Sequence, residues 1–126
     1  MKTHVFRLRR GSDLLKALQE YARTRRIAAG TVVSGVGCVT RARVRDASGV
    51  TVRELNEPLE IVSLMGTLST ARTHLHISLA REDLTVLGGH LNEARISATG
   101  ELVLTLIDGE LDREKSPEVG LNLWKF

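Results

Sequence analysis

The order of apolar and polar residues divides the chain into a short strand, one helix and a long series of strands. Alternating residues from His4 to Arg9 predict a first strand that ends at Gly11. Apolar residues then recur at helical spacing from Ser12 to Arg26, with Ser12 as the expected N-cap and several arginines in the last turn. This segment is the one strong helix signal in the sequence.

After Gly30 the sequence is rich in β-branched residues and predicts strands. The strand-like runs are TVVSGVG, VTRARVRD, GVTVREL, LEIVSLMGTLS, THLHISLA, LTVLGGHL and ISATGELVLTLID. Each run is short, and turn residues separate it from the next, with hairpin turns expected at residues 46–49 and 81–83. The C-terminal LDREKSPEVGLNLWKF predicts a turn followed by an apolar tail that docks on the body. One helix among many antiparallel strands predicts an α+β fold.

Composition adds a few limits to this picture. The 126 residues, without an evident linker or repeat, predict a single domain over residues 1–126, and 42% hydrophobic with 3% aromatic residues predicts an aliphatic core. No stretch has the length of a membrane helix or of a signal-peptide apolar region, and the single cysteine allows no internal disulfide. We therefore expect a cytoplasmic protein with no membrane partner. The net charge of +3 is compatible with an anionic partner without defining one.

Three of the four histidines lie in the segment RTHLHISLAREDLTVLGGHL. In a strand, His74 and His76 would project from one face with Cα atoms about 7 Å apart. A strand returning after the turn at 81–83 would place His90 beside them, and the preceding Gly-Gly would let the backbone bend or come close. Three imidazoles would leave the fourth position of a tetrahedral ion open. The spacing alone is equally compatible with a solvated polar face.

Several motifs together resemble the PPC domain (plants and prokaryotes conserved). They are SGVGCVTRA, LEIVSLMGTLS, HLHISLA followed by GGHL, GELVLTL and the ending GLNLWKF. The resemblance implies a bent, largely antiparallel sheet packed around one main helix (Ser12 to Arg26), a fold similar to that of acetolactate decarboxylases, and a homotrimer with sites near its subunit interfaces. It also implies that His74, His76 and His90 coordinate a divalent, zinc-like ion.

The sequence departs from the family pattern at three positions. Leu84 stands where a turn glycine is usual, which predicts a different turn type because leucine resists positive φ. Ala94 replaces a usual glycine, and Cys38 stands where serine is common. The Arg-Gly-Arg-Pro AT-hook of the plant nuclear proteins is missing from the sequence, so their mode of DNA binding does not transfer directly.

The first candidate function is a metal-dependent enzyme, a lyase or hydrolase acting on a small oxygenated or anionic molecule. An open three-histidine ion can act as a Lewis acid or lower the pKa of bound water. Glu60 and Glu101 lie on predicted strands within family-like motifs and are the candidate acid/base groups, or carboxylates that orient a histidine. Both could instead be ordinary surface carboxylates.

The second candidate function is a DNA-binding or regulatory module, which is the family-level description. Arg41, Arg43 and Arg45 alternate on one predicted strand, and Arg53 on the next strand could join them in a stripe that contacts phosphates or a small anion. The same arginines could form an ordinary solvated face, and the low aromatic content offers little for base stacking.

The third candidate function is a structural metal that locks a trimeric interaction module. Structural zinc sites usually close with four protein ligands, and the sequence supplies three histidines close together. Cys38 could be a fourth ligand, although a lone cysteine in this glycine-rich stretch is more typical of a small buried hydrophobe. His4, far away in sequence, is expected to be a surface residue at the end of a strand.

Overall fold

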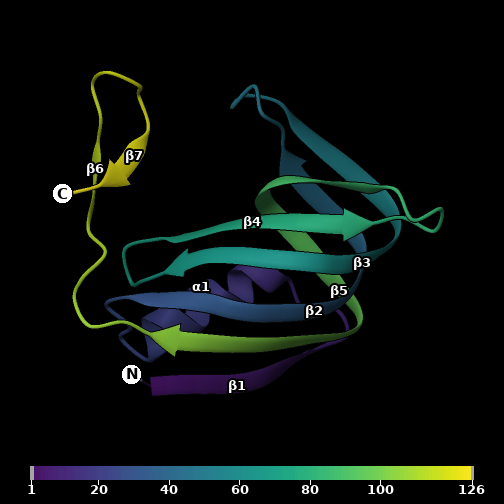
Figure 1. Ribbon diagram of the computed structural model, residues 1–126, viewed down its shortest axis with the longest axis horizontal. Helices are drawn as coiled ribbons and strands as arrows, with labels where there is room; N and C mark the ends of the chain where they lie inside the picture. The colour runs from purple at the N-terminus through teal and green to yellow at the C-terminus, as the bar shows by residue number, and fades with distance from the viewer. Residues whose placement is uncertain (1, 126) are drawn as a thin grey trace.

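The computed structural model describes residues 2–125 and contains one helix and seven strands within that range. In chain order they are β1 (Lys2–Arg9), α1 (Leu14–Thr24), β2 (Gly30–Arg45), β3 (Val52–Leu68), β4 (Thr73–Ala80), β5 (Val86–Leu106), β6 (Arg113–Lys115) and β7 (Asn122–Trp124) (Figure 1). Every strand pairing is antiparallel. The predicted α+β fold, a mostly antiparallel sheet with one short helix, is confirmed.

The main sheet is bent so that its last strands return to each other. Its strand order is β1-β5-β2-β3-β4, and the first residues of β5 also pair with β4. Strands β2, β3, β4 and β5 therefore close on one another at one end, and Figure 1 shows the long strands curving through this end. This closure places His90 directly opposite His76.

The division of β2, β3 and β5 into separate short strands was wrong. Each pair of runs forms one continuous strand, of 16, 17 and 21 residues respectively. The register shifts at several places, including between Val32 and Ser34 and between Gly37 and Val39. Such bulges bend a strand without ending it, so residues typical of turns were read as breaks.

The helix begins one residue later than the sequence suggested. Asp13, rather than Ser12, is the N-cap: its Oδ2 accepts a hydrogen bond from the backbone N–H of Lys16 at 3.1 Å. The other oxygen of Asp13 accepts from the backbone N–H of Ala94 in β5 at 2.8 Å. The two oxygens of the carboxylate serve the helix and the strand separately, whereas a serine has a single side-chain oxygen.

The core lies between α1 and the inner face of the sheet, and it is aliphatic as predicted. The helix contributes Leu14, Leu18 and Ala22, each fully buried. The sheet contributes alternate residues of its long strands, including Leu75, Ile77 and Leu79 of β4. Figure 1 shows the helix behind the sheet. None of the helical structure within residues 2–125 is long and apolar enough to cross a membrane.

The β4–β5 turn corrects one expectation. Leu84 adopts φ +72°, the left-handed conformation that the sequence analysis expected it to avoid. Its N–H donates to the carbonyl of Arg81 at 2.9 Å, and Asp83 Oδ1 accepts from the N–H of Thr85 at 2.9 Å. These hydrogen bonds, together with strand pairing on both sides, hold the conformation despite its cost of roughly 1–2 kcal/mol for a residue with a Cβ.

The C-terminal segment forms a small hairpin of its own. Strands β6 and β7 pair with each other, apart from the main sheet. In Figure 1 this hairpin stands beyond the end of the sheet at which β4 begins. The expected apolar tail is thus a hairpin, and it reaches the body near His74 through Arg113.

Candidate metal centre

The three histidines form one cluster on the face of the sheet opposite the core. In β4, His74 and His76 alternate with the buried Leu75 and Ile77, and strand pairing sets His90 beside His76. One ring nitrogen from each histidine lies within 4.8 Å of the others. The ring centroids are 5.1–5.7 Å apart, and the rings are inclined to one another rather than stacked. The i, i+2 spacing and the returning strand therefore act together as predicted from the sequence.

Gly88 and Gly89 are needed for the close approach of strands beside His90. A Cβ on Gly88 would lie 2.1 Å from the carbonyl oxygen of Ile77 in β4. A Cβ on Gly89 would lie 2.6 Å from the carbonyl oxygen of Arg45 in β2. Both distances are shorter than real Cβ contacts, so a side chain at either position would push apart the strands that carry His76 and His90.

The environment keeps two of the imidazoles neutral. Burial, followed by the charge of Arg72 and other nearby cations, lowers the pKa of His74 to about 4. Burial and the charge of Arg45 lower the pKa of His90 to about 4 as well. A metal ion binds the neutral imidazole through its lone pair. At neutral pH these two histidines are therefore already neutral, and they need not lose a proton before they bind an ion.

The donor set fits a divalent metal ion. Nδ1 of His90 is buried and has no hydrogen-bond partner among residues 2–125. A buried polar nitrogen without a partner is costly, and a metal ion would satisfy its lone pair. Neutral imidazoles are ligands that zinc and related ions prefer, and three of them leave one position open.

Three arginines surround the histidine cluster. Arg45 is the strand partner of His90, and Arg72 precedes His74 by two residues. Arg113 in β6 places Nη2 3.4 Å from His74 Nδ1. Within residues 2–125, none of these arginines forms an ion pair with a carboxylate.

Two of these arginines, Arg72 and Arg113, were not predicted from the sequence. Arg72 could have been found by extending the His74/His76 spacing back by two residues, because i−2 lies on the same face of a strand. Arg113 lies 39 residues from His74 in the chain, and no local pattern signals the contact. Its position depends on the fold of the C-terminal hairpin.

Glu60 and Glu101 do not join the histidines in the chain's own fold. Glu60 pairs with Cys38 and Ala80, four residues along β4 from His76. It lines a separate cavity of about 430 Å³. Glu101 pairs with Val36 and lies on the exposed surface, far along β5 from His90. Their roles as acid/base groups remain predictions.

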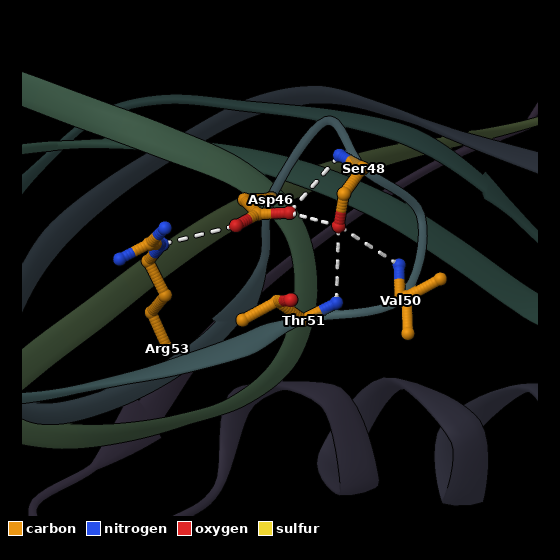
Figure 2. Close-up of polar contacts among 5 residues, drawn as sticks. All are labelled: Asp46, Ser48, Val50, Thr51 and Arg53. Atoms are coloured by element: carbon orange, nitrogen blue, oxygen red, sulfur yellow. Dashed lines mark hydrogen bonds and ion pairs between the residues drawn. The ribbon is translucent and has the colours of Figure 1, made fainter.

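The proposed arginine stripe is divided in the structure. Arg41 forms an ion pair with Glu54 at 2.5 Å. Arg53 Nε binds Asp46 Oδ2 at 3.0 Å, as Figure 2 shows, and the same aspartate also accepts from Ser48. Arg53 is the strand partner of the buried Val44, so it belongs to the other face from the remaining arginines. Arg43 and Arg45 are then the part of the stripe that forms no ion pair within residues 2–125.

Cys38 and His4 also lie away from the histidine cluster. Cys38 is half-buried and lines the same cavity as Glu60 and Ser97. A hydrogen bond with Ser97 and backbone hydrogen bonds lower the pKa of its thiol. We expected a small buried hydrophobe at this position, whereas Cys38 is partly exposed. His4, part-buried rather than on the surface, contacts the hydroxyl of Tyr21 through Nδ1.

These features define an α+β domain with a candidate three-histidine metal centre on its open face. The chain belongs to the Plants and Prokaryotes Conserved (PCC) domain family, called the PPC domain above, whose family model matches residues 1–108. Over 122 residues it is 34% identical to the bifunctional protein GlmU of Synechococcus sp. (strain JA-3-3Ab). That match covers 95% of this chain but 20% of GlmU. The chain therefore spans about a fifth of the length of this relative.

Solved structures share the complete fold. A metal-containing protein from Archaeoglobus fulgidus is 32% identical, with a TM-score of 0.84 over 100% of this chain and 94% of that one. A candidate DNA-binding protein from Bacteroides thetaiotaomicron is 26% identical, with a TM-score of 0.91 over 98% and 91% of the two chains. A Staphylococcus aureus protein similar to α-acetolactate decarboxylase has 10% identity and a TM-score of 0.58 over 86% and 54%. The expected likeness to that fold is confirmed.

Proposed function

We propose that this chain is a metal-binding PPC domain in which His74, His76 and His90 hold one divalent ion, with zinc as the expected metal. The observation that carries the proposal is the convergence of three ring nitrogens within 4.8 Å, one histidine having a buried Nδ1 without a partner. The fold of the metal-containing Archaeoglobus protein supports it. The whole of residues 1–126, with the C-terminal hairpin, is taken as one domain.

Metal analysis of purified protein tests this proposal. We expect about one ion per chain in the wild type and less than about a tenth of that in His74→Ala and His90→Ala, because two imidazoles alone bind zinc weakly. His4→Ala is the matched control, since that imidazole contacts Tyr21 outside the cluster. Equal metal content in the wild type and both cluster variants would overturn the proposal.

We further propose that the domain assembles as a homotrimer whose interface adjoins the histidines. Val33, Val36, Val62 and Met65 are large apolar side chains left 49–67% exposed on β2 and β3. Met65 is the strand partner of His76, so this apolar surface reaches the candidate metal centre. Exposed apolar side chains gathered in this way are typical of a protein interface.

Sedimentation equilibrium tests the assembly. We expect three times the mass of one chain for the wild type and a smaller species for Met65→Lys, because a charge would be buried at the interface. Val50→Lys is the control, since this exposed residue lies at the tip of the β2–β3 hairpin. A monomeric wild type would contradict the trimer while leaving the metal proposal standing.

Metal-dependent chemistry on a small anionic molecule is the second candidate function. Three ligands leave an ion with an open position, and an open cavity of about 280 Å³ lies beside His74 and His76. When bound, the ion would supply Lewis acidity. Arg45 and Arg113 would orient a negatively charged substrate. Turnover that is lost on chelation and restored by zinc would support the enzyme.

DNA binding has weaker support in this chain. The candidate DNA-binding protein from Bacteroides favours it, and Arg43 and Arg45 are available for phosphate contacts. The pairing of Arg41 and Arg53 with carboxylates opposes it. Salt-dependent DNA binding that falls in Arg43→Gln and Arg45→Gln would support this function, because each phosphate contact contributes to the salt dependence.

A further inference from the structure

The C-terminal hairpin holds a guanidinium against the candidate metal centre. Arg113 Nη1 donates to the backbone carbonyl of Asn122 at 3.1 Å, across the β6–β7 hairpin. Its guanidinium carbon lies 5.8 Å from the centroid of the Trp124 ring, within cation–π range. Nη2 then reaches His74 Nδ1 at 3.4 Å. Three contacts therefore fix the direction of this side chain.

The contact between Arg113 and His74 cannot coexist with a metal ion on His74. Arginine only donates hydrogen bonds, so His74 Nδ1 must accept with its lone pair and the proton must lie on Nε2. If an ion binds Nδ1, the lone pair is already used. If an ion binds Nε2, the proton moves to Nδ1, which then faces the arginine as a second donor. In either case the contact between Arg113 and His74 must break when the ion binds.

Arg113 forms no ion pair with a carboxylate in the described part of the chain, residues 2–125. The ion pairs within residues 2–125 involve Arg41, Arg53, Arg81 and Arg95, and all lie elsewhere. Arg45 is the strand partner of His90, and Arg72 precedes His74 by two residues. A divalent ion would add two more positive charges. The loaded site would thus contain several cations and only neutral imidazoles.

A cavity lies beside His74 and Trp124, the two rings that Arg113 contacts. It measures about 280 Å³ and is lined by Met65, Gly66, Thr67, His74, His76 and Trp124. One wall is therefore imidazole and the other is largely apolar. This size suits a small molecule with one charged end and a short apolar part, rather than a nucleic-acid duplex.

We propose that Arg113 is the anion-binding residue of this site and that the ligand is a small carboxylate or phosphate lying beside Trp124. The proposal rests on the proposed metal site, because metal binding is what frees the guanidinium. Planar guanidinium groups match carboxylate and phosphate oxygens in geometry and charge. The C-terminal hairpin then supplies part of the specificity of a centre whose ligands come from β4 and β5.

The test uses the full chain loaded with Co²⁺, whose visible spectrum reports on the ion's ligands. Arg113→Met removes the donors while keeping an unbranched side chain that can cover Trp124. Lys115→Met is the matched control, because Lys115 lies two residues along the same strand, is exposed, and loses the same charge. Inorganic phosphate and acetate are titrated separately into each loaded protein, and circular dichroism establishes that each variant is folded.

The expected result has opposite signs for the two ligands. Arg113→Met should bind Co²⁺ about two- to tenfold more tightly, because a donor no longer competes for the His74 lone pair. The same variant should bind the preferred anion about tenfold or more weakly, because a charge-assisted hydrogen bond is lost. Lys115→Met should change neither constant by more than about twofold, as expected for an exposed charge.

Trp124 supplies a second readout, since it is the only tryptophan in the sequence. Zn²⁺ should change its fluorescence in the wild type when Arg113 leaves His74, and phosphate or acetate should change it again. In Arg113→Met the second change should require about tenfold or more higher anion concentration than in the wild type.

Two results would overturn the inference and distinguish it from the metal proposal. If wild-type protein binds Co²⁺ but neither anion, or if Arg113→Met loses no more anion affinity than Lys115→Met, the role of Arg113 is wrong and the metal site stands. If wild-type protein shows no Co²⁺ spectrum before any anion is added, the metal proposal and this inference both fall.

Discussion

Two cavities along the β3–β4 part of the sheet differ in how their charges are balanced. The larger cavity, of about 430 Å³, contains Cys38 and Glu60, and the guanidinium of Arg81 on its wall is 2.9 Å from Glu57. The smaller one, of about 280 Å³, lies beside His74 and His76. Near these histidines, Arg45, Arg72 and Arg113 have no carboxylate partner within residues 2–125.

The two cavities differ in unmet chemistry as well as in volume. In the Cys38 cavity, the thiol has hydrogen-bond partners and Arg81 is paired with Glu57. At the histidine cluster, a buried nitrogen lacks a partner and positive charge accumulates. Such an arrangement is costly in an empty protein and becomes favourable when an ion and an anion bind.

Gly88→Ala should have the largest effect, and it should disturb the two strands that carry His76 and His90. The new Cβ would lie 2.1 Å from the carbonyl oxygen of Ile77, so β4 and β5 must separate where His76 and His90 face each other. We expect a loss of more than about 3 kcal/mol in the free energy of unfolding and loss of bound metal. Urea denaturation and metal analysis measure the two effects.

Gly49→Ala is the control for glycine replacement itself. Gly49 has φ +77° but no atom within 4 Å of an added Cβ. The expected cost is about 1–2 kcal/mol, from backbone conformation alone, with full metal content. Metal content that survives in Gly88→Ala would show that the close strand approach is not what holds the histidines together.

Acidification should have the next largest effect on stability. This effect should come from the histidine cluster and not from the Cys38 cavity. The pKa of His74 and of His90 is about 4 in the fold, below the ordinary 6.5. As pH falls from about 6.5 to 4, the unfolded chain takes up protons that the folded chain does not, so stability of the metal-free protein decreases. Thermal denaturation after chelation, from pH 7.5 to 4, measures this loss.

Replacing both histidines with glutamine should flatten the pH profile above pH 4. Asp46 and Asp83 titrate below the range from pH 6.5 to 4. Hydrogen bonds from Ser48 and Thr85 lower the pKa of their carboxyls below 3.8. Their contribution to stability is lost only as pH falls through those lowered values. An identical profile in wild type and double variant would contradict the predicted role of the histidines.

The three histidines of the cluster could be predicted from the sequence because strand and hairpin geometry depends on neighbouring residues. Two-residue periodicity placed His74 and His76 together, and the hairpin return placed His90 beside them. Arg113 was not predictable, because its contact depends on how a separate hairpin folds back on the sheet. The α+β class followed from the pattern, whereas the long pairing of β5 with β2 depends on bulges with no simple signature.

Leu84, which lines the Cys38 cavity, is a position where a local preference of the residue gave a wrong prediction. Its intrinsic preference argued against positive φ, but strand pairing and turn hydrogen bonds impose φ +72°. Leu84→Gly should therefore raise the free energy of unfolding by about 0.5–1 kcal/mol, because relief of the left-handed conformation exceeds the added chain entropy. The leucine is 82% exposed, so little burial is lost.

Glu82→Gly, an exposed change in the same turn, is the control for Leu84→Gly. It should lower stability by about 0.4–1 kcal/mol, because the unfolded chain gains freedom without relief of strain. Urea denaturation of the two variants should therefore give opposite signs. Destabilisation by both would mean that Leu84 is not strained.

The smallest expected effect concerns Cys38 and should leave the metal untouched. The hydrogen bond with Ser97 lowers the pKa of the Cys38 thiol, so a larger fraction is thiolate near neutral pH. In Ser97→Ala the pKa should rise, and alkylation by iodoacetamide at pH 7.5 should slow by a few-fold. Because Cys38 and the histidines lie in separate cavities, alkylated wild-type protein should keep its full metal content. Release of metal on alkylation would mean that strain passes along β3 and β4 between the two cavities, and the contrast between them would then describe two ends of one coupled site.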